Sequence, residues 1–363
     1  MTIKERIEAV LRGELPDRIP FTIYHKMLPR GGAERRLRER GLGFAWRTEV
    51  IKWEYPNCQI TSCQYAEDGA DKQRITWRTP VGEVHYDNIL NGAYGSAWRV
   101  GHPIRSRDDY RVMEYIARDA RPVPVDEDVR RLQDSVGEDG YVIGSLGYSP
   151  LMEMIEYLIG VNNYGYEMMD NADPFWSLYE AMCDKMRRAY PLVAKSPVHL
   201  VLYDGNIHPQ VVGLPRFEQY IKPCLEELGC LLHENGKLLG SHLDADNRAF
   251  MTSIAHSSLD VVEAFTPPPD CSVSLQEARA AWPDKIIWCN YPSSVHLADG
   301  NVIRQTTAAL LAETAPGDRF ILGITEDIPE DRVCFSLGVI ADVLDQAGKT
   351  PISGSCDPAD GDV

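Results

Sequence analysis

The stretch KLLGSHLDADNRAFMTSIAHSSLDVVEAFTPPP, residues 237–269, has the pattern of a strand–helix–strand unit. Apolar runs at 237–241 and 259–262 predict two short buried strands. Between them, residues 242–247 have the composition of a polar turn, and residues 248–257 have that of a helix. A strand, a helix and a second strand in this order predict a βαβ unit with parallel strands.

Three polar side chains stand at the ends of these two strands. His242 and Asp244 follow the first strand, and Glu263 closes the second. Groups at the carboxyl ends of parallel strands face a shared crevice. We therefore expect His242, Asp244 and Glu263 to converge, although they are well separated in the chain.

Length and composition are those of a globular α/β protein. The chain has 363 residues, of which 44% are hydrophobic and 25% are charged, so it can bury a substantial core. The formal charge of −17 argues against a polyanionic partner, because nucleic-acid binding needs a basic face. The densest basic cluster, residues 35–40, reads as an exposed helix face.

The sequence predicts a cytoplasmic protein. The N-terminal segment lacks the apolar core of a signal peptide, and no window approaches the roughly 18 apolar residues that a membrane span requires. The nine cysteines form no C-x-x-C pair. An odd number of cysteines in a large domain fits reduced thiols better than a disulfide framework.

Apolar segments alternate with helical segments along most of the chain. Strands are predicted near residues 20–25, 49–54, 141–146, 199–203, 238–242, 259–262, 286–290 and 319–324. Eight strands that alternate with helices predict an α/β fold, a (β/α)8 TIM barrel, whose catalytic groups gather at the C-terminal mouth. A doubly wound sheet is the alternative, but no G-x-G-x-x-G or G-x-x-x-x-G-K-[ST] motif follows any strand.

Additions to the barrel are also predicted. A helix precedes the first strand, and the segments 74–78 and 83–86 read as a β-hairpin that lies outside the βα repeat. We therefore predict one barrel domain over 1–349 with an inserted flap region at 56–135. The Pro-, Gly- and Asp-containing residues 350–363 predict a disordered tail.

The predicted mouth is acidic and contains histidine. The strand ends place there His25, Asp204, His242, Asp244, Glu263, Asn290, Glu326 and Asp327. We predict catalytic roles for Asp204, His242, Asp244 and Asn290.

A metal ion is one reading of this mouth. Zn²⁺ accepts imidazole and carboxylate ligands, and a catalytic site leaves one position open, so His242, Glu263 and Glu326 would suffice as ligands. Carboxylates at a barrel mouth can equally serve only to bind a polar substrate. Asp204 and its neighbours 205–206 can also be a plain strand-terminating turn.

Several segments together resemble the uroporphyrinogen decarboxylase superfamily over most of the chain. They are Pro16-Asp-Arg-Ile-Pro20, Thr79-Pro-Val-Gly82, Asp204-Gly-Asn206, Arg216-Phe217, His233-Glu-Asn-Gly-Lys237, His242-Leu-Asp-Ala-Asp-Asn247 and Ile321-Leu-Gly-Ile-Thr-Glu326. The resemblance implies a TIM barrel. It also implies one of two activities: decarboxylation of uroporphyrinogen, or zinc-dependent methyl transfer involving corrinoid proteins, small thiols, tetrahydrofolate or methylated substrates.

Decarboxylation fits the residues poorly. The true decarboxylases carry an M-R-Q-A-G-R element after the first strand, where this chain has His25-Lys-Met-Leu-Pro-Arg30. The mouth is also acidic, and like charges would repel the many carboxylates of a porphyrinogen. We therefore expect another activity.

The methyltransferase branch fits better, with one departure. Its coenzyme M enzymes bind zinc through H-x-C on one strand end and a cysteine on the last. Here His242-Leu-Asp244 and Thr325-Glu-Asp327 occupy these places, so carboxylates replace both thiolates. Such a site still binds Zn²⁺ but is less thiophilic.

The resemblance then implies a demethylase component that moves a methyl group from a small O- or N-methylated compound to a corrinoid protein or tetrahydrofolate. The sequence contains no D-x-H-x-x-G corrinoid motif, so we expect the acceptor to be external. The alternative is a metal-free lyase, similar to uroporphyrinogen decarboxylase, or a ligand-binding barrel, with Asp204, His242 and Glu263 as acid, base or hydrogen-bonding groups. A homo-oligomer is compatible with either.

Overall fold

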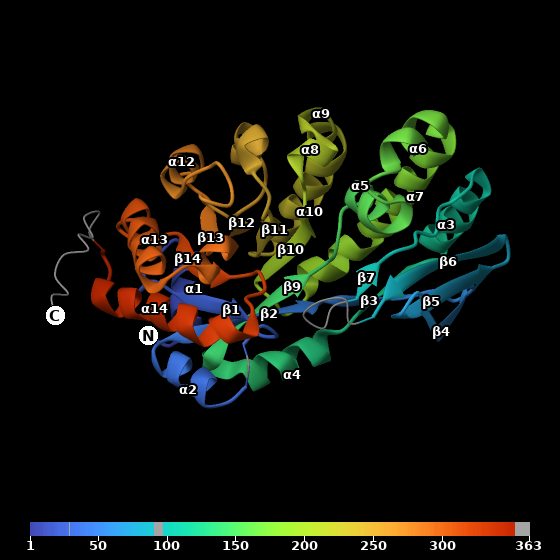
Figure 1. Cartoon of the computed structure of the whole chain (residues 1–363). Helices are drawn as coiled ribbons and strands as arrows, with labels where there is room; N and C mark the ends of the chain where they lie inside the picture. Colours follow the sequence, from blue (N-terminus) through green and yellow to red (C-terminus); the bar gives the residue numbers. More distant parts are fainter. Residues whose placement is uncertain (29, 91–96, 353–363) are drawn as a thin grey trace.

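The computed structural model describes residues 1–28, 30–90 and 97–352 (Figure 1). Eight parallel strands form a closed barrel in the order β1-β14-β13-β12-β11-β10-β9-β2. The strands are β1 (Phe21–Tyr24), β2 (Leu42–Glu49), β9 (Gly140–Ser145), β10 (Leu200–Gly205), β11 (Leu238–His242), β12 (Val261–Phe265), β13 (Ile286–Asn290) and β14 (Phe320–Ile324). This architecture confirms the predicted (β/α)8 TIM barrel.

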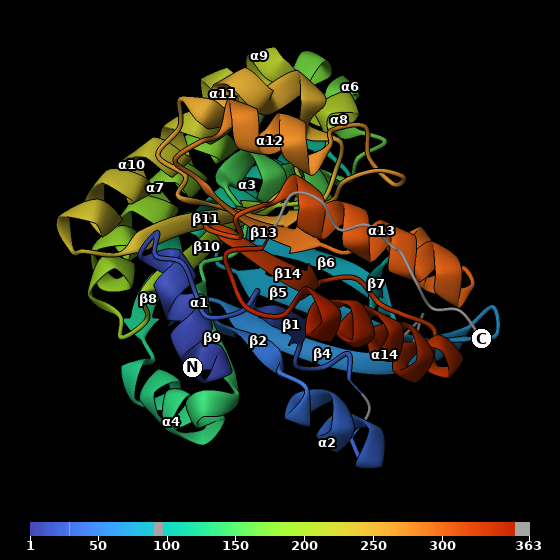
Figure 2. The same ribbon diagram turned by 90° about the vertical axis from the view of Figure 1, so that its left-hand side faces the viewer.

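Helices cover the outside of the barrel, which is why its strands read as continuous apolar runs. They are α2 (Gly32–Glu39), α5 (Pro150–Glu153), η2 (Met154–Ile159), α6 (Tyr164–Asp170), α7 (Ala172–Lys195), α8 (Pro209–Val212), α9 (Leu214–Arg216), η3 (Phe217–Ile221), α10 (Lys222–Glu234), η4 (Asn247–Phe250), α11 (Met251–Ala255), α12 (Leu275–Ala281), η5 (Ser293–Leu297), α13 (Gly300–Glu313) and α14 (Glu330–Ala347). Figure 2 shows α13 and α14 side by side on the surface. No helix in the described part of the chain is long and apolar enough to span a bilayer.

Alternate strand residues point into the barrel and fill it. Ala45, Ile143, Leu202, Trp288 and Ile321 come from five strands and belong to one buried cluster. Because side chains alternate between the two faces of a strand, residues two positions further along these strands also face inward, toward the mouth. The apolar interior therefore gives way to polar side chains at the C-terminal ends.

The N-terminal helix α1 (Ile3–Leu11) packs against the barrel interior. It starts with a capping box, in which Thr2 Oγ1 accepts a hydrogen bond from Glu5 N at 3.2 Å and Glu5 Oε2 accepts one from Thr2 N at 2.8 Å. Ile3 and Ile7 join the cluster of inward-facing strand residues. Gly43 of β2 permits this contact, because a Cβ there would lie 2.3 Å from Ile3 Cγ1.

The predicted second barrel strand at 49–54 was wrong. β2 runs from Leu42 to Glu49, whereas Ile51–Glu54 forms β3, which pairs antiparallel with β8 (Arg121–Pro124) outside the barrel. The segment 49–54 is rich in strand-forming residues, but β2 starts with Leu-Gly-Phe-Ala, and glycine weakens a strand signal. The close approach of Ile3 explains why glycine stands there.

The predicted hairpin is confirmed and belongs to a larger inserted sheet. Four antiparallel strands, β4 (Gln59–Glu67), β5 (Ala70–Thr79), β6 (Gly82–Ile89) and β7 (Trp98–Arg99), follow one another in the sheet. They are followed by α3 (Arg107–Asp119), then β8, α4 (Asp126–Val136) and η1 (Gly137–Asp139), which lead into β9. Figure 1 shows the sheet extending away from the barrel beside α3.

The last described residues lie against the barrel. Thr350 N donates a hydrogen bond to Asp17 O at 3.1 Å, and the buried Ile352 donates one from its backbone N to Pro316 O at 3.0 Å. The predicted tail began at 350, and its residues 353–363 lie outside the described part of the chain.

Candidate active site

A buried histidine–carboxylate pair lies at the mouth of the barrel. His242 ends β11, and its Nδ1 atom is 2.7 Å from Glu263 Oε2. The exposed fraction is 7% for His242 and 0% for Glu263. Glu263 was predicted to close its strand, but it lies in the middle of β12, where it faces inward like Val261.

The second oxygen of Glu263 is also occupied. Tyr24 OH donates a hydrogen bond to Glu263 Oε1 at 2.5 Å, and Arg47 Nη1 donates one to Tyr24 OH at 3.2 Å. Burial by itself raises the pKa of Glu263, but the adjacent His242 and Arg47 lower it below its ordinary value. Glu263 is therefore a fixed, charged carboxylate.

The other side of the imidazole faces carboxylates in the open part of the mouth. Asp244 Oδ2 lies 3.7 Å from His242 Nε2. One ligand atom from each of His242, Asp244 and Glu326 lies within 4.8 Å of the others. We call these three residues the His–Asp–Glu group.

The charges of this group are coupled. Burial lowers the pKa of His242, but Glu263 and Asp244 outweigh burial and raise it to about 10. Burial and the neighbouring Asp244 raise the pKa of Glu326. Burial by itself raises the pKa of Asp244, but the neighbouring His242 outweighs burial and lowers it. In the structure as described, the cationic imidazole holds these carboxylates together.

The donor set of the His–Asp–Glu group fits a divalent metal ion such as Zn²⁺. One imidazole nitrogen and two carboxylates are accepted zinc ligands, and three protein ligands leave a position open. A carboxylate behind the imidazole is also typical, because it fixes the ring and keeps Nε2 free to coordinate. Glu263 has this arrangement at Nδ1.

The structure brings together most of the residues predicted from the sequence. His242 and Glu326, two of the predicted ligands, belong to the His–Asp–Glu group. Glu263, the third, lies behind the imidazole, and Asp244 stands in front of it instead. Tyr24 and Arg47 were not predicted as site residues, although both occupy inward-facing positions near the ends of the first two barrel strands.

Asp204 lies at the same mouth on a strained turn. Its backbone has a φ of 69°, and β10 has an irregular register between Leu202 and Gly205. Asp204 Oδ1 accepts a hydrogen bond from Gly205 N at 3.0 Å. Burial raises the pKa of Asp204 to about 7, so its carboxyl group can hold a proton near neutral pH.

Asn290 forms hydrogen bonds to residues at the ends of both neighbouring strands. Its Nδ2 donates a hydrogen bond to Thr266 Oγ1 at 3.2 Å, and its Oδ1 accepts one from Thr325 N at 3.0 Å. These contacts tie the ends of three strands together and fix the backbone directly before Glu326. His25 stacks on Trp46 with ring centroids 3.8 Å apart and is not part of the cavity wall.

A cavity of about 460 Å³ opens over these groups. Its wall includes Tyr24, Arg47, Tyr148, Asp204, Asn206 and the His–Asp–Glu group. Asn206 Nδ2 donates a hydrogen bond to Tyr148 OH at 2.8 Å, which fixes one side of the opening. The cavity has room for a small substrate beside the acidic groups.

The structure is similar to that of a methyltransferase from Methanosarcina mazei. The TM-score is 0.56, and the match covers 95% of this chain and 99% of the other. The two sequences are 12% identical, so the likeness shows a shared fold. No family model and no curated protein sequence matches the chain.

Proposed function

We propose that this protein is a methyltransferase that removes a methyl group from a small O- or N-methylated compound and passes it to an external acceptor. The observation that carries the proposal is the His–Asp–Glu group backed by Glu263 at the mouth of a TIM barrel. The shared fold with a methyltransferase supports the same class of reaction.

In this proposal His242 Nε2, Asp244 and Glu326 hold a zinc ion. Glu263 accepts the Nδ1 proton of His242 and so keeps the Nε2 lone pair directed at the mouth. When bound, the ion supplies Lewis acidity at the oxygen or nitrogen of the substrate. A zinc ion with carboxylate ligands is a harder Lewis acid, so it suits an oxygen or nitrogen atom of the substrate better than the sulfur of a thiol.

Asp204 would supply the proton that the reaction needs. The methyl group leaves as a cation equivalent, the bond between carbon and the heteroatom breaks, and the electron pair stays on the heteroatom. A carboxyl group with a pKa of about 7 can protonate that atom near neutral pH. Asp204 and the His–Asp–Glu group line one cavity. The carboxyl group of Asp204 can therefore donate its proton to the substrate heteroatom in that cavity.

The methyl acceptor would be a reduced corrinoid protein or tetrahydrofolate. The sequence has neither a dinucleotide fingerprint nor a D-x-H-x-x-G motif, so we assign the acceptor to a separate molecule. The acceptor has to reach the open cavity at the barrel mouth.

A metal-free lyase is the second candidate. The observation that favours it is the raised pKa of both His242, to about 10, and Asp204, to about 7, which makes two proton donors available in one cavity. Such donors could protonate the carbanion left by loss of carbon dioxide.

Two measurements decide between these functions. Elemental analysis of the purified full-length chain after expression with added metal should give about one zinc per chain under the first proposal. Methylated substrates should be turned over only when reduced corrinoid protein or tetrahydrofolate is supplied. Product formation by the metal-free enzyme alone would replace methyl transfer with the lyase.

A further inference from the structure

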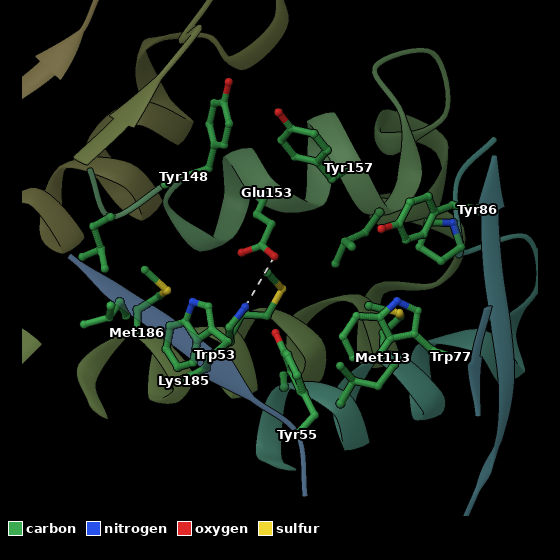
Figure 3. Close-up of a pocket in the computed structure, with 18 of the residues that line it drawn as sticks. Trp53, Tyr55, Trp77, Tyr86, Met113, Tyr148, Glu153, Tyr157, Lys185 and Met186 are labelled. Atoms are coloured by element: carbon green, nitrogen blue, oxygen red, sulfur yellow. Dashed lines mark hydrogen bonds and ion pairs between the residues drawn. The ribbon is translucent and has the colours of Figure 1, made fainter. Parts of the chain in front are cut away.

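A second cavity, of about 380 Å³, lies beside the barrel mouth. The inserted sheet, β3, α3, η2 and α7 enclose it (Figure 3). Tyr148 and Tyr157 lie along one side, whereas Trp53 and Lys185 lie along the other. About half of the lining residues belong to the segments inserted between β2 and β9, and the others belong to the barrel strands and to the loop and helices that follow β9, so the insertion and the barrel form the cavity together.

The second cavity borders the candidate active site. Ser145, Gly147 and Tyr148 line both cavities. These residues lie at the end of β9 and directly after it, where the barrel meets the insertion. A ligand in the second cavity can therefore extend one end past Tyr148 toward the His–Asp–Glu group.

Six aromatic side chains line the second cavity. They are Trp53, Tyr55, Trp77, Tyr86, Tyr148 and Tyr157. Tyr55 and Trp77 meet edge to face with ring centroids 4.7 Å apart. Methionines 113, 182 and 186 also line the cavity. Aromatic rings and thioethers both make favourable contacts with a flat aromatic ligand.

Two cationic and two anionic side chains line this cavity. Lys185 is buried, and its Nζ lies 3.5 Å from Glu153 Oε1 and 4.8 Å from the centroid of the Trp53 ring. Among the described residues Glu153 is its one hydrogen-bond acceptor. Arg99 adds a second cation, 3.7 Å from the centroid of the Tyr86 ring, whereas Glu49 is exposed.

We propose that the second cavity binds the body of the methylated substrate, and that this substrate is an aromatic compound carrying a carboxylate. The aromatic ring lies among the aromatic side chains, and the carboxylate is held by Lys185. The methyl group then points past Tyr148 to the His–Asp–Glu group. The inference rests on the proposed function, because it assigns that reaction its substrate.

The buried Lys185 sets this orientation, because its ammonium group lines the second cavity and has one hydrogen-bond acceptor, Glu153, among the described residues. A lysine with unused N–H groups in a poorly hydrated site gives strong charge-assisted hydrogen bonds.

Isothermal titration calorimetry with 3-methoxybenzoate tests the proposal on the full chain. The wild type should bind the probe, and Trp77→Ala should weaken binding about 10-fold through loss of ring contacts. Lys185→Met should weaken 3-methoxybenzoate binding about 10-fold but leave the neutral 3-methoxybenzyl alcohol unaffected. Arg187→Met, which removes an exposed cation from the same helix, is the matched control and should change nothing.

His242→Ala separates this inference from the proposed function. It should keep 3-methoxybenzoate binding, because the probe is held by the second cavity. Lys185→Met leaves Glu153 unpaired, so if it does not fold, Trp77→Ala in the inserted sheet carries the test. Absence of probe binding in the folded wild type, or unchanged binding in Trp77→Ala, overturns the inference. Intact binding without methyl transfer to any acceptor overturns the proposed function alone.

Discussion

His242 and Glu263 lie on neighbouring strands, with the imidazole Nδ1 2.7 Å from a carboxylate that has no solvent exposure. Tyr24 holds the second carboxylate oxygen, so Glu263 cannot turn toward the cavity without breaking two hydrogen bonds. The pair therefore fixes the imidazole with Nε2 directed toward Asp244 and the open mouth.

His242→Ala should lower turnover at least ~100-fold, because it removes a group from the reacting centre without disturbing the apolar core. The purified variant should also lose its zinc, as measured by elemental analysis. His256→Ala is the control: its ring contacts the backbone of its own helix, at Thr252 O, and is exposed. Wild-type turnover in His242→Ala would remove His242 from the proposed mechanism.

The ligand set can be resolved by three amide substitutions. Asp244→Asn and Glu326→Gln should each abolish stoichiometric zinc binding. Glu263→Gln should keep zinc but weaken its affinity about 10- to 100-fold, because it alters the support of the imidazole and not a ligand. Calorimetric titration with zinc measures the zinc affinity of each variant and so ranks the three substitutions. Complete zinc loss in Glu263→Gln together with full retention in Asp244→Asn would restore the set His242, Glu263 and Glu326.

Gly43→Ala should lower the free energy of unfolding by about 1–3 kcal/mol, because the new Cβ would lie 2.3 Å from Ile3 Cγ1. Ile3→Ala should cost stability in the wild type but recover part of the loss in Gly43→Ala. Urea unfolding of the wild type, the two single variants and the double variant measures the coupling free energy between positions 3 and 43. Gly338→Ala is the control, since nothing lies within 4 Å of its Cβ position in α14. Equal losses in both glycine variants would contradict the proposed packing of α1.

His296 should make the protein sensitive to mild acid. Burial lowers its pKa to about 4, and Nδ1 lies 2.6 Å from Ser336 Oγ. In the unfolded chain its pKa is about 6.5. As the pH falls from about 6.5 to about 4, His296 becomes protonated in the unfolded state but stays neutral in the folded state. The free energy of unfolding therefore falls by up to roughly 3 kcal/mol.

His296→Gln cannot titrate and should flatten this pH dependence, whatever its effect on stability at pH 7. Urea unfolding at intervals between pH 7 and pH 4.5 compares the two slopes. Parallel slopes for wild type and variant would show that His296 is not the group responsible. His233→Gln is the matched control, because His233 lies on an exposed helix end beside Asp260.

The sequence by itself determined the barrel and the strands that carry its central groups. Buried parallel strands are short apolar runs, and such runs stand out before His242 and around Asn290 whatever packs against them. The polar residues that follow them lie at the carboxyl ends, so His242 and Glu326 could be placed at one mouth from the chain alone.

The tertiary structure decided the rest, because contacts between distant segments leave no local pattern. Glycine at position 43 hid the second strand, and its reason is a contact with Ile3 from another element. Whether Glu263 or Asp244 faces the open side of His242 depends on strand register and the inward face of β12, which sequence spacing does not encode. The second cavity likewise exists because folding brings Trp77 of the inserted sheet close to Lys185 of α7, more than a hundred residues later in the chain.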